Sequence, residues 1–168
     1  MKKANTILVT VGLLIGAAVF WWTQPRQSES NKVLSNGISL TNQWLTVTPA
    51  SDFKTVGPWS ELFIVLPGKS SFEGNPPRLF LENVGEVEIE GYLVADDGSK
   101  VGLTQSEVML NEQGLVSLSS PALQWKDRDY LFRNVALRSN FPIRTGKLIW
   151  VSDDPREHKD GTLHPKLD

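Results

Sequence analysis

The chain of 168 residues contains no cysteine. This absence excludes disulfides, thiolate metal sites, a cysteine nucleophile and a lipidated cysteine behind an N-terminal apolar run. The only two histidines, His158 and His164, lie in a polar C-terminal stretch without the rigid pocket that general-base, triad or zinc chemistry requires. Gly-x-Ser-x-Gly and glycine-rich phosphate-binding motifs are also missing. We therefore expect no catalytic residue, no metal and no cofactor, and interpret the protein as non-enzymatic.

Charge is absent from residues 4–24, which form a long apolar run. A helix rises about 1.5 Å per residue, so about 20 residues match the roughly 30 Å hydrocarbon core of a bilayer. The run predicts a transmembrane anchor over residues 1–22 that contacts the lipid bilayer through residues 4–24. The side chains expected in lipid or at its boundary are Ile7, Leu8, Leu13, Leu14, Ile15, Phe20, Trp21 and Trp22.

A cleaved signal peptide is the alternative interpretation of this run, with the small residues 16–18 at the cleavage site. Cleavage there would leave the large apolar residues 19–22 at a new N-terminus. Tryptophan is favoured at a membrane–water boundary, so the pair that ends the run favours an uncleaved anchor. Lys2 and Lys3 place the N-terminus in the cytoplasm by the positive-inside bias, and the remainder in the periplasm or outside the cell.

Within the run, Gly12 and Gly16 have the GxxxG spacing. Both glycines fall on one helix face and leave a groove into which a second helix can pack. The spacing predicts a helix–helix contact, with a second copy or with a larger membrane protein. Two glycines tolerated in a lone membrane helix are the alternative, because glycine is common in such spans.

Beyond the apolar run the composition changes to polar residues, glycine and proline. Residues 23–36 are interpreted as a linker, residues 37–152 as one folded domain, and residues 153–168 as a polar tail that hangs free or lies on the surface. Only two of the 17 basic residues precede Trp22, which leaves 15 basic against 19 acidic residues beyond it, a net charge of −4. This balance gives no basic surface for nucleic acid.

The folded domain has the pattern of β-structure. Val87, Ile89, Gly91 and Leu93 alternate with polar residues and with Tyr92, so this stretch predicts a strand with one buried and one wet face. No window beyond the apolar run keeps a period of 3.6. Short apolar stretches separated by turn residues predict an all-β fold, an antiparallel β-sandwich of the jelly-roll kind.

Glu86, Glu88 and Glu90 point to the same side of that strand. Carboxylates on one side suggest a cation site or the pair that hydrolyses glycosidic bonds. A flat wet strand provides no pocket for such chemistry. We therefore favour a solvated strand face, or an edge kept charged against aggregation.

Loop tryptophans are the candidate ligand contacts. The long loop over residues 49–60 contains Trp59 after a Gly-Pro pair, and loops on a rigid β-scaffold are frequent binding sites. Trp59 is the leading contact and Trp125 the second, with Asp127 and Arg128 as hydrogen-bonding neighbours.

The other two tryptophans of this region are expected in the core. Trp150 lies in a strongly apolar strand, and Trp44 alternates with its neighbours in a short strand. Neither is therefore proposed as a ligand contact.

Residues 130–143, which end in Phe-Pro-Ile, are followed by residues 147–155, an apolar stretch with a central tryptophan. These two segments resemble the late strands of galactose-binding-like jelly rolls. The resemblance implies a jelly-roll fold, and many such domains bind carbohydrate while others are structural or join proteins. It carries no ligand residue over to this chain.

Three hypotheses follow for the function. The first is a membrane-anchored, non-catalytic domain of the bacterial cell envelope that binds a glycan. The second is an accessory subunit that uses the β-sandwich to bind an envelope protein partner. The third is a carboxylate-dependent glycosidase, which would need two carboxylates in one concave pocket.

Overall fold

The structure is a computed structural model that describes residues 30–167 apart from 67, 69, 75–77, 83, 107–113 and 126–128. The predicted anchor, its Gly12–Gly16 motif and the first part of the linker lie outside the described residues. Within the described residues, no helix is long and apolar enough to cross a bilayer.

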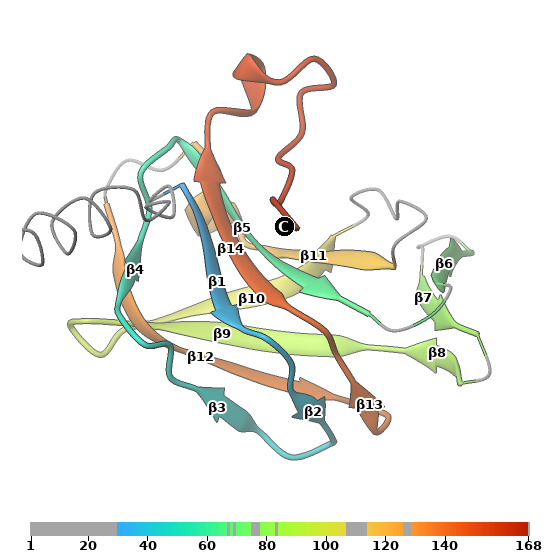
Figure 1. Cartoon of the computed structure of the whole chain (residues 1–168). Helices are drawn as coiled ribbons and strands as arrows, with labels where there is room; N and C mark the ends of the chain where they lie inside the picture. The colour runs from blue at the N-terminus through green and yellow to red at the C-terminus, as the bar shows by residue number, and fades with distance from the viewer. Residues whose placement is uncertain are drawn as a thin grey trace, which may run out of the picture.

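The described chain is antiparallel β-structure with two short 3-10 turns (Figure 1). The first seven strands are β1 (Asn31–Ser35), β2 (Ser39–Leu40), β3 (Leu45–Val47), β4 (Phe53–Lys54), β5 (Trp59–Val65), β6 (Ser70–Glu73) and β7 (Arg78–Leu81). The remaining strands are β8 (Gly85–Val87), β9 (Ile89–Ala95), β10 (Lys100–Ser106), β11 (Leu115–Ser119), β12 (Leu131–Ser139), β13 (Ile143–Arg144) and β14 (Leu148–Asp153). The 3-10 turns are η1 (Pro121–Leu123) and η2 (Pro155–Glu157).

The main sheet has the order β1-β14-β5-β11-β10-β9-β12-β3, and β4 also pairs with β12. Strand β10 turns the corner, because Lys100–Leu103 pair with β9 whereas Thr104–Ser106 pair with β11. The sheet therefore folds into an upper layer (β1, β14, β5 and β11) and a lower layer (β9, β12, β3 and β4), as Figure 1 shows. This arrangement confirms the predicted antiparallel β-fold.

Two smaller sheets complete the fold. In the sequence, strand β2 lies between β1 and β3, which are the edge strands of the main sheet. It pairs with β13 to form a two-stranded ribbon and also contacts β12, so the ribbon bridges the two edges of the main sheet. Strands β6, β7 and β8 form a separate three-stranded sheet, which leads directly into β9.

The main core lies between the two layers. Trp150 at its centre is fully buried and meets the rings of Phe53 and Phe132 edge-on, with centroids 5.3 and 5.6 Å apart. Its indole N–H donates to the carbonyl of Lys54 at 2.9 Å, so the one polar atom of the ring is satisfied. The prediction of Trp150 as a core residue is confirmed.

A second apolar cluster covers the outer face of the upper layer. Phe63, Ile149 and Val151 point away from the main core and pack against Leu163 of the C-terminal segment, which is 3% exposed. Figure 1 shows this segment leaving β14 and turning back towards the sheet. The segment predicted as a polar tail thus contributes a leucine to a buried cluster.

The folded domain also begins earlier than predicted. Asn31–Ser35, assigned to the linker, form β1 and pair with β14. Leu34 is buried in the main core and Val33 packs on the second cluster, so each face of this strand supplies an apolar side chain. Two apolar residues among polar ones are too short a pattern to indicate a strand without its partner.

Candidate functional site

Trp59, the leading predicted contact, does not lie in a long loop. It is the first residue of β5, is half-buried, and pairs with Asp153 of β14. Strand β4 interrupts the predicted loop by pairing with β12. The indole N–H of Trp59 donates to Glu61 Oε1 at 2.8 Å, which fixes the orientation of the ring. Trp59 therefore serves as a support for its neighbours more than as a free contact.

Glu61 is a buried carboxylate on the outer face of the upper layer. Its side chain also accepts a hydrogen bond from Ser117 Oγ at 2.6 Å, and the residue is 3% exposed. Burial raises the pKa of Glu61, and the hydrogen bonds from Ser117 and Trp59 oppose part of that rise. The carboxylate ties β5 to β11 and holds Trp59 in place.

Trp125 is the exposed member of this region. It is 53% exposed, and it is the only non-glycine residue among the described ones with positive φ, at 50°. Its ring meets Trp59 edge-on, with centroids 5.6 Å apart and an angle of 87° between the planes. Positive φ is strained for a bulky residue and persists only where the surroundings enforce it; such strain is concentrated at functional sites.

Arg156 completes what we call the end cluster, made of Trp59, Trp125 and Arg156. Its guanidinium carbon lies 5.0 Å from the Trp125 ring centroid, within cation–π range. Asp154 positions this guanidinium, because its carboxylate accepts a hydrogen bond from Arg156 Nε at 2.9 Å. Hydrogen bonding with Arg156 lowers the pKa of Asp154. Asp127 and Arg128, the predicted hydrogen-bonding neighbours, lie outside the described residues.

The rest of the C-terminal segment is held by local polar contacts. The carboxylate of Asp160 accepts from the N–H of Thr162 at 3.2 Å and contacts His164 Nε2 at 2.7 Å. Loss of solvent raises the pKa of Asp160, but the contacts with Thr162 and His164 outweigh it and lower the pKa to about 2. Among the described residues, no group of three or more histidines and carboxylates is arranged to hold a metal ion.

A second group of side chains lies on the outer face of the lower layer. We call this group the face cluster, and it consists of Trp44, Tyr92, Lys100 and Arg138. The rings of Trp44 and Tyr92 lie with centroids 5.0 Å apart. The guanidinium carbon of Arg138 lies 4.7 Å from the centroid of the Trp44 ring, and Lys100 Nζ lies 4.5 Å from the centroid of the Tyr92 ring. The four side chains thus form a continuous series of cation, ring, ring and cation.

The prediction of Trp44 as a core residue is wrong, since the side chain is 44% exposed. Leu45, the next residue, packs on the main core instead, and a strand sends successive side chains to opposite faces. The alternation in β9 had already indicated that Tyr92 lies on the wet face. Trp44 joins it there, because β3 and β9 flank β12 in the lower layer.

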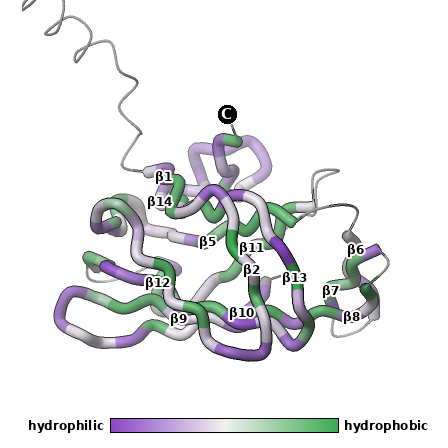
Figure 2. Tube along the Cα trace, turned by 60° about the horizontal axis from the view of Figure 1, so that its bottom comes forward, coloured by the Kyte–Doolittle hydropathy of each residue, from purple (hydrophilic) through white to green (hydrophobic). Residues whose placement is uncertain are grey.

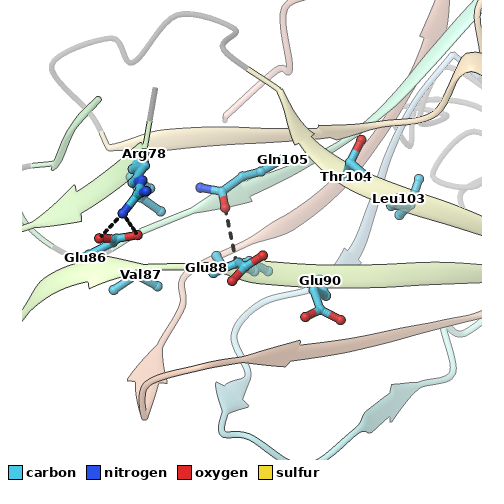
Figure 3. Close-up of a pocket in the computed structure, with 10 residues that line it drawn as sticks. Arg78, Glu86, Val87, Glu88, Glu90, Leu103, Thr104 and Gln105 are labelled. Atoms are coloured by element: carbon cyan, nitrogen blue, oxygen red, sulfur yellow. Dashed lines mark hydrogen bonds and ion pairs between the residues drawn. The ribbon is translucent and has the colours of Figure 1, made fainter. Parts of the chain in front are cut away.

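The three glutamates of the wet strand face border a pocket of about 480 Å³ at the corner where β8 and β9 approach β10. Figure 3 shows Glu86 turned towards Arg78, and both of its oxygens accept from Arg78 Nη1 at 3.1 Å. Glu90 accepts from Arg138 Nη2 at 2.6 Å. Each of these two carboxylates thus forms an ion pair with an arginine.

Comparison with protein-family models, with curated proteins and with solved structures gives no match for this chain. The resemblance to galactose-binding-like jelly rolls therefore stays a prediction.

Proposed function

We propose that the protein is a membrane-anchored, extracytoplasmic and non-catalytic domain of the bacterial cell envelope, and that it binds carbohydrate through the end cluster. The observation that carries the proposal is Trp125, a large apolar side chain held more than half exposed in a strained backbone conformation. The free energy of folding favours neither feature, so a ligand contact accounts for both.

The chemistry of the end cluster suits a sugar. The C–H face of a pyranose packs against an aromatic ring, and the Trp125 ring supplies such a surface. Arg156 adds N–H donors beside the ring for sugar hydroxyls. Trp59 and Glu61 lie behind them and keep the exposed ring in one orientation. A pre-oriented ring loses little entropy when a ligand stacks on it.

The anchor over residues 1–22 is the second part of the proposal. It would hold the β-domain close to the membrane, with the N-terminus in the cytoplasm. The jelly-roll resemblance supports carbohydrate as the ligand. The alternative is an accessory subunit of a membrane protein complex that uses the β-sandwich to bind a protein partner. The helix–helix contact predicted for it at Gly12 and Gly16 lies outside the described residues.

The test uses the full-length protein, purified in detergent, against an array of bacterial envelope glycans and against purified peptidoglycan sacculi. Trp125→Gly is the informative variant, because glycine relieves a strain of about 1–3 kcal/mol while losing an aromatic contact of about 0.5–1.5 kcal/mol. We expect the variant to unfold at about the same temperature as the wild type and to bind glycan at least tenfold more weakly.

Phe141→Ala is the matched control, since Phe141 is 48% exposed and follows the opposite end of β12. It should leave glycan binding unchanged. The proposal is wrong if the wild type binds none of the glycans, or if Trp125→Gly binds them as tightly as the wild type does.

A further inference from the structure

We propose that the pocket at the corner of the main sheet is a second binding site, and that it takes the side chain of a lysine, or of a similar aliphatic amine, carried by a peptide. The pocket has a volume of about 480 Å³. It shares no residue with the end cluster, so this inference does not rest on carbohydrate binding at Trp125.

The change of partner in β10 opens the pocket. Leu103 is the last residue of β10 that pairs with β9, where it lies opposite Gly91. From Thr104 onward β10 pairs with β11 instead, so β9 and β10 separate beyond this point. The side-chain amide of Gln105 crosses between them, because its Oε1 accepts a hydrogen bond from the N–H of Ile89 at 3.2 Å. Residues of both separated strands line the pocket (Figure 3).

Gln105 carries a buried donor without a partner. Its Nε2 atom is shielded from solvent and has no hydrogen-bond partner in the described part of the chain. The hydrogen bond from Ile89 fixes how the amide is turned, and Figure 3 shows its nitrogen on the side of Arg78. Buried donors without a partner are rare, and each one costs free energy of folding. A carbonyl oxygen of a ligand in the pocket would supply the missing acceptor.

Glu88 carries a charge without a partner. The pocket is lined by three carboxylates and one guanidinium, which gives an excess of two negative charges. Glu86 and Glu90 each form an ion pair with an arginine, whereas the Glu88 carboxylate makes neither an ion pair nor a hydrogen bond with another described residue. The main-chain N–H of Glu88 is bonded to Asn140 Oδ1 at 2.8 Å, which holds its backbone in place. An unpaired carboxylate in a negatively charged pocket attracts a cation.

The apolar part of the lining decides which kind of cation fits. It consists of four buried side chains of the main core, Leu79, Val87, Ile89 and Leu103. A metal ion is held by oxygen ligands and gains nothing from such a surface. A lysine side chain joins four methylene groups to an ammonium, so its stem can lie on the apolar side chains while its end binds Glu88.

A peptide carries both groups that the pocket calls for. Gln105 is hydrogen-bonded to Ile89, the next residue after Glu88, so the unpaired donor and the unpaired carboxylate belong to neighbouring positions. The main-chain carbonyl of a lysine residue would accept from Gln105 Nε2 while the ammonium of the same residue binds Glu88. Arg78 has 59% of its side chain exposed, so it can move to admit the ligand.

The experiment is a two-dimensional NMR titration of the amide groups of the full-length protein in detergent. The ligands are Nα-acetyl-lysine amide, its norleucine analogue, which has the same stem without the ammonium, and cadaverine, which has ammonium groups without a carbonyl. We expect the lysine ligand to bind with a dissociation constant on the order of 1 mM, and the other two about three- to tenfold more weakly. The side-chain amide signal of Gln105 should move on binding, and that of the exposed Gln43 should not.

Glu88→Gln removes the charge and keeps the shape. Because Glu88 is exposed, the variant should unfold at the same temperature as the wild type, yet bind the lysine ligand about three- to tenfold more weakly. Its binding of the norleucine analogue should not change. Glu82→Gln is the matched control, since Glu82 is an exposed carboxylate between β7 and β8 that does not line the pocket, and it should leave binding unchanged.

Three results would overturn the inference. Equal binding of the norleucine and lysine ligands would show that the ammonium is not recognised. Equal binding by Glu88→Gln and the wild type would show that Glu88 does not hold it. Equal binding of cadaverine, with an unmoved Gln105 signal, would refute a peptide as the ligand. A lysine ligand that moves the Gln105 signal and loses affinity in Glu88→Gln, but not in Glu82→Gln, would uphold this site even if the protein binds no glycan.

Discussion

The outer faces of the two layers differ although both belong to one continuous sheet. In β14, on the upper layer, the first five residues are all buried, whereas in β9 buried and half-buried residues alternate strictly. In Figure 2 the lower strands contain both green hydrophobic and purple hydrophilic segments. The difference arises because the C-terminal segment covers the upper layer with Leu163, while on the lower layer Trp44 is exposed and Tyr92 is half-buried.

The largest expected effect is a difference in the free energy of unfolding between two variants, each with one residue changed on one of the two outer faces. Ile149, on β14, is fully buried between the sheet and the C-terminal segment, and Val94, on β9, is half-buried. Ile149→Ala should lower the free energy of unfolding by about 2–5 kcal/mol, and Val94→Ala by less than about 1 kcal/mol. Urea titration of both variants measures this. Equal costs would show that the upper face is as open as the lower one.

Leu163→Ala should have the next largest effect. It removes the side chain that links the C-terminal segment to Phe63 and Ile149, at an expected cost of about 2–3 kcal/mol. The nearby Lys159→Ala, at an exposed position of the same segment, is the control and should cost less than about 0.5 kcal/mol. A Leu163→Ala variant as stable as the control would mean that the segment does not cover the sheet in solution.

The smallest effect concerns the buried carboxylate. Because burial raises the pKa of Glu61 in the folded state above its ordinary value of 4.5, its ionised form opposes folding, and this penalty disappears as the pH falls through the folded pKa towards 4.5. Glu61→Gln keeps an acceptor for Trp59 and a polar partner for Ser117. The variant should therefore exceed the wild type in stability at pH 7.5 by more than it does at pH 5.

Urea titrations of Glu61→Gln and the wild type at the two pH values test this expectation. Taking the difference between the two proteins removes the contribution of the other titrating groups. A difference that does not change with pH would mean that Glu61 is in contact with solvent.

The sequence predicted elements whose pattern is local. Strand β9 was identified from its alternation, and Trp150 from an apolar run that only a doubly covered strand tolerates. The alternation around Trp44 gave two faces but not which of them is buried, because that choice depends on Leu45 meeting the core. Trp44 was therefore assigned to the wrong face.

The elements that the sequence missed depend on distant partners. Strand β1 pairs with β14, and β4 pairs with β12, so neither has a pattern of its own. Leu163 is one apolar residue in a polar segment, which carries no periodicity. Trp59 was placed in a loop for the same reason, and its bond to Glu61 could not be anticipated because a buried carboxylate looks in sequence like a solvated one.

Hydroxyl-radical footprinting of the full-length protein, with and without peptidoglycan sacculi, tests the central claim most directly, since it reports each tryptophan separately. We expect rapid modification of Trp44 and Trp125 in the free protein and slow modification of the buried Trp150. Sacculi should protect Trp125 and leave Trp44 and Trp150 unchanged. Equal modification of Trp125 with and without sacculi would contradict carbohydrate binding at the end cluster.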